Sequence, residues 1–101
     1  MHALFATAVV ATAILAAPAM AQPVSHYSAT FATAPARTAI VTRNTIWKCN
    51  GATCIAPKSG TRDAIMCELV AREVGALQSF AVAGTAFDAD ALARCNTRAK
   101  G

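Results

Sequence analysis

Groups that catalytic sites require are scarce in this sequence. It contains two histidines, His2 and His26, and Asp, Glu, Lys and Arg together make up 14% of its 101 residues. A nucleophilic Ser or Cys needs a base held beside it, and no Gly-x-Ser-x-Gly, P-loop or dinucleotide-binding motif is present. Carboxylate pairs that act together need a cleft, for which a single small core leaves little room. We therefore expect that the protein is not an enzyme.

Runs of positive charge are also lacking. Nine Lys and Arg against five Asp and Glu give a net charge of +4, but the basic residues are scattered along the chain. A nucleic-acid-binding surface usually gathers its basic residues on one face, with aromatic residues between them. We expect no nucleic-acid partner.

Long apolar runs are limited to one, at the N-terminus. It ends at Ala17, and Ala19-Met20-Ala21 follows, a small-x-small triplet of the kind that signal peptidase cleaves after. The run is shorter than the roughly 20 residues of a membrane-spanning helix. Residues 1–21 therefore indicate a signal peptide, cleaved near Ala21-Gln22, that leads to the periplasm or to secretion and meets the membrane only transiently. Because no Lys or Arg precedes the apolar run, an uncleaved membrane anchor is the alternative.

Four cysteines are present, Cys49, Cys54, Cys67 and Cys95. In an oxidising compartment thiols usually form disulfides, and a small core gains most from them. Four cysteines allow three pairings. Asn50-Gly51 predicts a hairpin turn, and a four-residue loop would place Cys49 opposite Cys54, so we favour Cys49–Cys54 with Cys67–Cys95.

Two other uses of the cysteines are less well supported by their spacing. Structural zinc sites prefer Cys-x-x-Cys pairs, and thiol oxidoreductases carry Cys-x-x-Cys at the start of a helix. Neither pattern occurs here, so we expect no metal and no cofactor. A reactive Cys49–Cys54 pair remains an alternative.

Local patterns predict a small α+β domain over residues 37–101, preceded by a flexible arm over residues 22–36 that is rich in Ala, Ser, Thr and Pro. The domain is expected to hold a small antiparallel sheet, including the hairpin, and two helices, stapled by disulfides. Predicted strands are 38–42, 45–49, 54–56 and 77–82.

The first helix is predicted over residues 62–74, with Thr61 as its N-cap and Gly75 as its stop. The second helix is predicted to begin at Asp88, another N-cap, and to place Cys95 on its inner side. From Asn96 onward we expect the chain to fray.

Trp47 is the remaining residue that draws attention, because it is the single tryptophan and lies two residues before Cys49. Packing over a disulfide is the favoured interpretation. Trp47 is also a candidate contact residue for a sugar or a protein partner, the role of an exposed aromatic side chain.

Three blocks, Ile46–Lys58, Ala64–Gly75 and Phe87–Asn96, resemble a family of short, uncharacterised exported proteins of alphaproteobacteria. Its members carry a Trp-x-Cys hairpin, a helix with one cysteine and a C-terminal Leu-Ala-x-Cys-Asn. The resemblance implies export and four paired cysteines, and it implies no catalytic or ligand-binding residue.

The predicted function is therefore that of a non-catalytic exported domain, an interaction or envelope-associated module with a protein or an envelope polymer as its partner. The alternative is a redox- or metal-responsive protein that uses Cys49 and Cys54.

Overall fold

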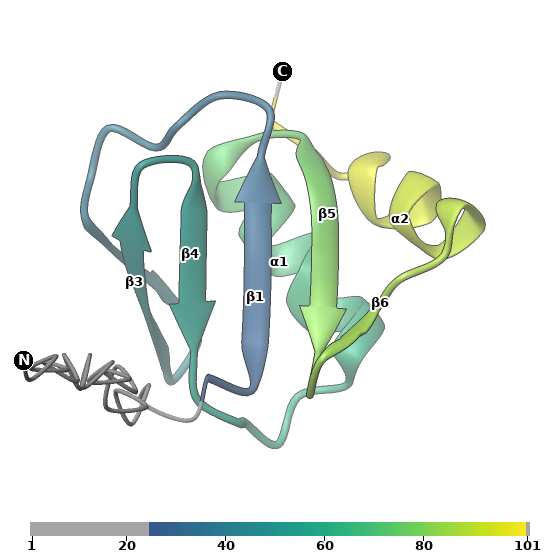
Figure 1. Ribbon diagram of the computed structural model, residues 1–101, viewed down its shortest axis with the longest axis horizontal. Helices are drawn as coiled ribbons and strands as arrows, with labels where there is room; N and C mark the ends of the chain where they lie inside the picture. The colour runs from purple at the N-terminus through teal and green to yellow at the C-terminus, as the bar shows by residue number, and fades with distance from the viewer. Residues whose placement is uncertain (1–24, 101) are drawn as a thin grey trace, which may run out of the picture.

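The computed structural model describes residues 25–100, so the predicted signal peptide and its cleavage site lie outside the described residues. The elements, in chain order, are β1 (Tyr27–Phe31), β2 (Ala39–Thr42), β3 (Thr45–Asn50), β4 (Thr53–Ala56), α1 (Asp63–Val74), β5 (Leu77–Val82), β6 (Thr85–Ala86) and α2 (Ala89–Asn96). The strands form one six-stranded antiparallel sheet in the order β2-β3-β4-β1-β5-β6. The predicted α+β fold class is confirmed (Figure 1).

The central strand β1 comes from the segment that we expected to be a flexible arm. It lies between β4 and β5 and pairs with both of them. Tyr27, Ala29 and Phe31 are buried, whereas Ser28 and Thr30 are partly exposed. This alternation is the period of a half-buried strand, and it outweighs the Ala, Ser and Thr content on which the expectation of an arm rested. The domain therefore begins before residue 37, and the prediction of an arm is wrong for residues 27–31.

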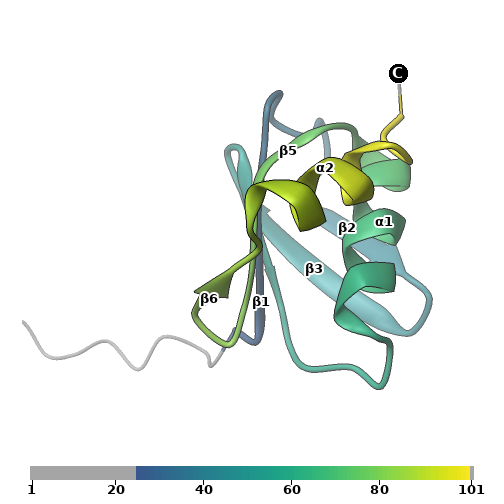
Figure 2. The same ribbon diagram turned by 90° about the vertical axis from the view of Figure 1, so that its right-hand side faces the viewer.

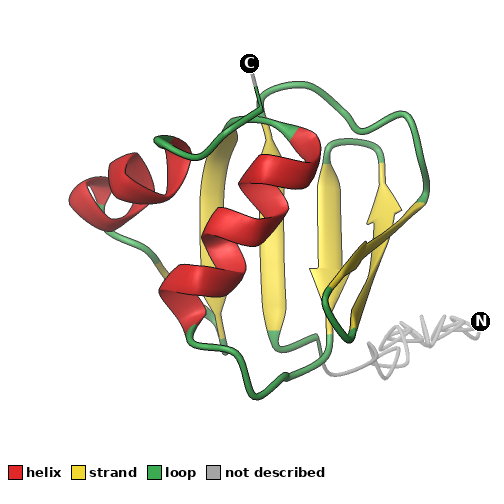
Figure 3. Cartoon of the chain, turned by 180° about the vertical axis from the view of Figure 1, so that it is seen from behind, coloured by secondary structure: helices red, strands yellow, loops and turns green. Residues whose placement is uncertain are grey.

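Both helices lie on the same side of the sheet (Figure 2). Seen from behind, α1 crosses the strands diagonally and α2 lies beyond β5 (Figure 3). One side of α1 is buried beneath the sheet, where Met66, Cys67 and Val70 are fully buried. Helices that cover one face only leave the other face of an antiparallel sheet open to solvent.

Aromatic side chains fill the layer between sheet and helices. The ring centroid of Tyr27 lies 5.8 Å from that of Trp47 and 6.1 Å from that of Phe80. All three side chains are at most 1% exposed. Such large side chains dominate the energetics of a small core, so the sheet is held rigidly from one side.

The two helices begin differently. Asp88 caps α2 as predicted, because its Oδ1 accepts a hydrogen bond of 2.8 Å from the backbone N–H of Ala91. At α1 the N-cap is Arg62 and no side chain caps the first turn, so the prediction of Thr61 as N-cap is wrong. The hydroxyl of Ser59 instead accepts from the N–H of Thr61 (3.1 Å), which forms the turn before the helix.

Residues 96–100 are docked against the domain, where we expected the chain to fray. The side-chain amide of Asn96 accepts from the N–H of Leu77 and donates to the carbonyl of Leu77, both at 2.8 Å. The N–H of Lys100 donates to the carbonyl of Ala71 at 3.0 Å. A single amide group thus ties the end of α2 to the start of β5.

Candidate functional site

The predicted disulfide Cys49–Cys54 is confirmed across the β3–β4 hairpin. The two cysteines are direct cross-strand partners, but Asn50 and Thr53 also pair. The loop is therefore shorter than the expected four residues and consists of Gly51-Ala52, with Gly51 at a φ of 61°, which glycine adopts without strain. Cys54 is fully buried and Cys49 is partly exposed.

The predicted disulfide Cys67–Cys95 is also confirmed, and it joins the inner faces of α1 and α2. Both residues are at most 2% exposed. No free cysteine is left, and within residues 25–100 no three His, Cys, Asp or Glu side chains gather as metal ligands would. In the structure all four cysteines are therefore paired, one disulfide linking two strands and the other linking the two helices.

Trp47 is not a contact residue, because it is 0% exposed. Its indole N–H donates to the hydroxyl oxygen of Thr42 at 2.8 Å. That hydroxyl in turn donates to the sulfur of Met66 on α1 at 3.2 Å. Trp47 and Cys49 lie on the same side of β3, two residues apart, so packing in the disulfide-bonded core is the correct interpretation.

The face of the sheet that looks toward the viewer in Figure 1 carries no helix. We call it the open face. The pairing registers assign to it one side of each strand. Its members are Ser28, Thr30, Ala39, Val41, Ile46, Lys48, Asn50, Thr53, Ile55, Ser79, Ala81 and Ala86.

The chemistry of the open face changes from one end to the other. Val41 and Ile46 pair directly at one corner and are 59% and 58% exposed. Toward the opposite end the side chains are polar, including Asn50 and Ser79, and the hydroxyls of Thr30 and Thr53 lie 3.3 Å apart. The face therefore offers an apolar corner beside a polar area.

Two hollows lie at the rims of the sheet. The first, of about 220 Å³, lies beside the ion pair that Arg37 makes with Glu73 of α1 (3.1 Å). The second, of about 440 Å³, lies between the β2–β3 turn and the loop before α1, and we call it the turn pocket. Its lining residues are Arg43, Asn44, Thr45, Pro57, Lys58, Ser59, Gly60 and Thr61.

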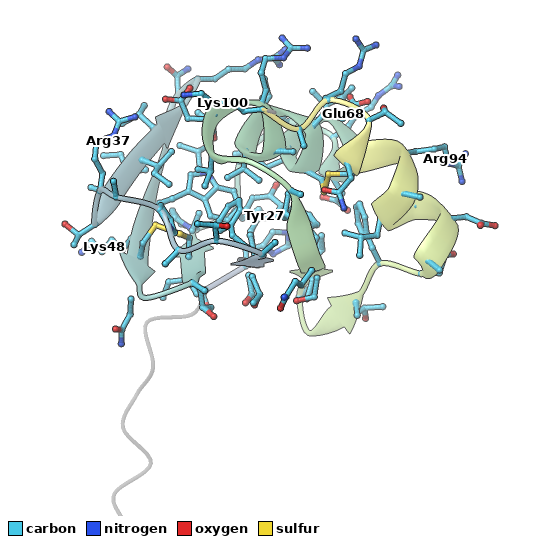
Figure 4. The ribbon with its side chains drawn as sticks, turned by 90° about the horizontal axis from the view of Figure 1, so that it is seen from above. Tyr27, Arg37, Lys48, Glu68, Arg94 and Lys100 are labelled. Carbon is cyan, nitrogen blue, oxygen red and sulfur yellow. A yellow bond between two sulfur atoms is a disulfide. The ribbon has the colours of Figure 1, made fainter. Side chains whose placement is uncertain are left out.

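The charged side chains of the helical layer point outward. In Figure 4, Arg94 projects from α2 into solvent, whereas Tyr27 lies inside the molecule. The part of the chain that the structure describes includes no helix that is both long and apolar enough to cross a membrane.

Comparison with family models identifies the group of proteins to which these features belong. The model of a family of unknown function (DUF8200) matches residues 10–97. The chain belongs to this family. No curated protein and no solved structure matches it.

The DUF8200 match includes all four cysteines, the open face and the turn pocket. The resemblance to an uncharacterised family is thereby confirmed at the level of the family. Its finer parts, the Trp-x-Cys hairpin as a family feature and the alphaproteobacterial origin, stay predictions.

Neither the open face nor the turn pocket is predicted by the sequence patterns considered above. The sequence signal for the open face is the alternation of apolar and polar side chains in Tyr27–Phe31. This alternation indicates the strand β1, which lies at the centre of the face. The turn pocket is lined by residues 43–45 and residues 57–61. A local sequence pattern cannot indicate that these two loops lie next to each other.

Proposed function

We propose that this DUF8200 protein is an exported, non-catalytic module that binds a protein or an envelope polymer through its open face. One observation carries the proposal: Val41 and Ile46, the large apolar side chains that are exposed on the described part of the chain, lie side by side on that face. The two disulfides support export, because such bonds persist in oxidising compartments.

Single exposed apolar side chains are normal on protein surfaces, whereas neighbouring ones often indicate an interaction site. Ile55, which is partly exposed, lies across from Lys48, two residues from Ile46 along β3. The three apolar side chains therefore form one corner of the face. This corner suits a partner that lies against the uncovered side of the sheet, and the hydroxyls on the same face can form hydrogen bonds with polar groups of that partner.

The test is chemical crosslinking of the exported protein in the cell envelope, followed by mass spectrometry. We expect a specific partner to be crosslinked to residues of the open face. The double variant Val41→Thr, Ile46→Thr keeps β-branched side chains and should lose most of the crosslinked product, whereas Ala93→Ser on the exposed side of α2 should keep it. Equal recovery with both variants would contradict the proposal.

A second candidate, a redox-responsive protein, rests on the partial exposure of Cys49. The other three cysteines are at most 2% exposed, so a small thiol reductant reaches the hairpin disulfide first. Titration with such a reductant, read by free-thiol mass spectrometry, tests this candidate. Reduction of Cys49–Cys54 well before Cys67–Cys95, at a potential found in the compartment, supports it, and simultaneous reduction on unfolding contradicts it.

A further inference from the structure

The turn pocket is lined by donors and by positive charge. Arg43 and Asn44 come from the β2–β3 turn, and Lys58, Ser59 and Thr61 come from the loop that precedes α1. No Asp or Glu belongs to its lining. Such a set of groups suits an anion, because guanidinium, ammonium, amide and hydroxyl groups all donate hydrogen bonds to oxygen.

Thr45 supplies an observation that is independent of the charges. Thr45 as a whole residue is 4% exposed, and its hydroxyl takes part in none of the side-chain hydrogen bonds found within residues 25–100. Every side-chain oxygen that is fully shut off from solvent does have a partner in the described part of the chain. The hydroxyl of Thr45 must therefore keep an accessible side, and the turn pocket is the hollow that Thr45 lines. A hydroxyl that keeps an accessible side at the edge of a hollow is available to a ligand.

The hydroxyl of Ser59 is held in position by two neighbouring groups. Its hydroxyl oxygen accepts from the N–H of Thr61 at 3.1 Å and lies 3.4 Å from the phenol oxygen of Tyr27. The phenol has one proton, which it gives either to the oxygen of Ser59 or to the carbonyl of Thr61, at 3.5 Å. When the phenol donates to Ser59, the proton of Ser59 is left to donate into the pocket.

We propose that the turn pocket binds a phosphate-type oxyanion, with Arg43 and Lys58 neutralising its charge and Thr45 and Ser59 donating hydrogen bonds to its oxygens. The first turn of α1, which no side chain caps, adds positive potential at the same end of the molecule. Asp63 lies in that first turn but does not line the pocket. The proposal is independent of binding at the open face.

The oxyanion has two natural sources, a small soluble phosphate and the headgroup of a phospholipid. The experiment therefore has three arms, which are inorganic phosphate, glycerol 3-phosphate, and vesicles of phosphatidylglycerol against vesicles of phosphatidylcholine. Binding to the oxidised protein is followed by the amide shifts of Thr45, Ser59 and Gly60 in NMR spectra, with chloride at equal ionic strength as the reference.

The variants separate a binding role from a structural one. Arg43 has a φ of 53°, a conformation that Asn tolerates better than Arg, so Arg43→Asn removes the charge without straining the turn. We expect Arg43→Asn and Lys58→Gln each to weaken binding about tenfold, as lost charge-assisted hydrogen bonds do. Thr45→Val should weaken it about three- to tenfold, and Thr45→Ser should restore it.

Arg94→Gln on α2 is the matched control, since it removes one exposed positive charge far from the lining of the pocket. It should change binding by no more than about twofold. The proposal is supported if binding in at least one arm is saturable, is weakened by the pocket variants and is not weakened by the control. The arm that responds identifies the source of the phosphate. An absence of saturable binding in all three arms overturns it, as does binding that chloride reproduces or that the pocket variants leave unchanged.

Discussion

Val41 and Ile46 are direct cross-strand partners on the uncovered side of the sheet, where they are 59% and 58% exposed. Their neighbours along the strands, Ile40 and Trp47, are also cross-strand partners, but they point to the helices and are at most 2% exposed. Because strand side chains alternate between faces, one hairpin presents an apolar pair to the core and another to solvent. The buried pair should therefore contribute more to the free energy of unfolding than the exposed pair does.

Ile40 and Ile46 allow this difference to be measured with one substitution. Ile40→Ala should lower the free energy of unfolding by about 2–4 kcal/mol, because it leaves a cavity in the core. Ile46→Ala should cost about 1 kcal/mol or less, since more than half of the side chain is already in water. Urea denaturation followed by circular dichroism gives both values. Similar losses for the two variants would mean that the open face is covered by protein.

The two disulfides should contribute unequally to stability. The cysteines of Cys67–Cys95 are separated by 28 positions in the sequence, whereas those of Cys49–Cys54 are separated by 5. On the loop-entropy model, replacing each pair by alanines lowers the free energy of unfolding by about 3.5 and about 2 kcal/mol respectively. Thermal and urea unfolding of the two double variants, compared with the oxidised wild type, checks the order. A greater loss from the hairpin pair would show that native strain or packing, and not chain entropy, dominates.

Much of this fold could be predicted from the sequence, because its signals are local. The helix over 62–74 and the strand over 77–82 follow from periodicity, and the pairing of Cys49 with Cys54 follows from the hairpin between them. The strand β1 was missed since five residues of alternating pattern in a segment rich in small residues carry little weight without their neighbours.

The docking of residues 96–100 could not be predicted because it depends on a contact between distant parts of the sequence. Nothing within α2 indicates that the amide of Asn96 meets the backbone of Leu77, nineteen residues earlier in the chain. The turn pocket likewise depends on two loops from distant parts of the sequence. Contacts of this kind are set by the packing of the whole domain.

Trp47 should be coupled energetically to Thr42. Trp47→Phe keeps most of the apolar volume but removes the N–H that donates to the hydroxyl of Thr42, and we expect it to lower the free energy of unfolding by about 2 kcal/mol. Thr42→Val also removes the hydrogen bond to Met66. In a double-mutant cycle the two changes should cost less together than the sum of their separate effects, by about 1 kcal/mol. Additive losses would indicate that the hydrogen bond adds no stability.

Asn96 tests whether the end of the chain is held by its side-chain amide. Asn96→Ala removes both the acceptor for the N–H of Leu77 and the donor to its carbonyl, and partly buried backbone groups left without partners typically cost about 1–3 kcal/mol. Asn96→Asp keeps an acceptor and loses the donor, so its loss should lie between that of wild type and that of Asn96→Ala. Hydrogen exchange gives a local readout: the amide of Leu77 should exchange faster in Asn96→Ala and stay protected in Asn96→Asp. If the Leu77 amide keeps its protection in both variants, the docking depends on the disulfide Cys67–Cys95 and not on the amide.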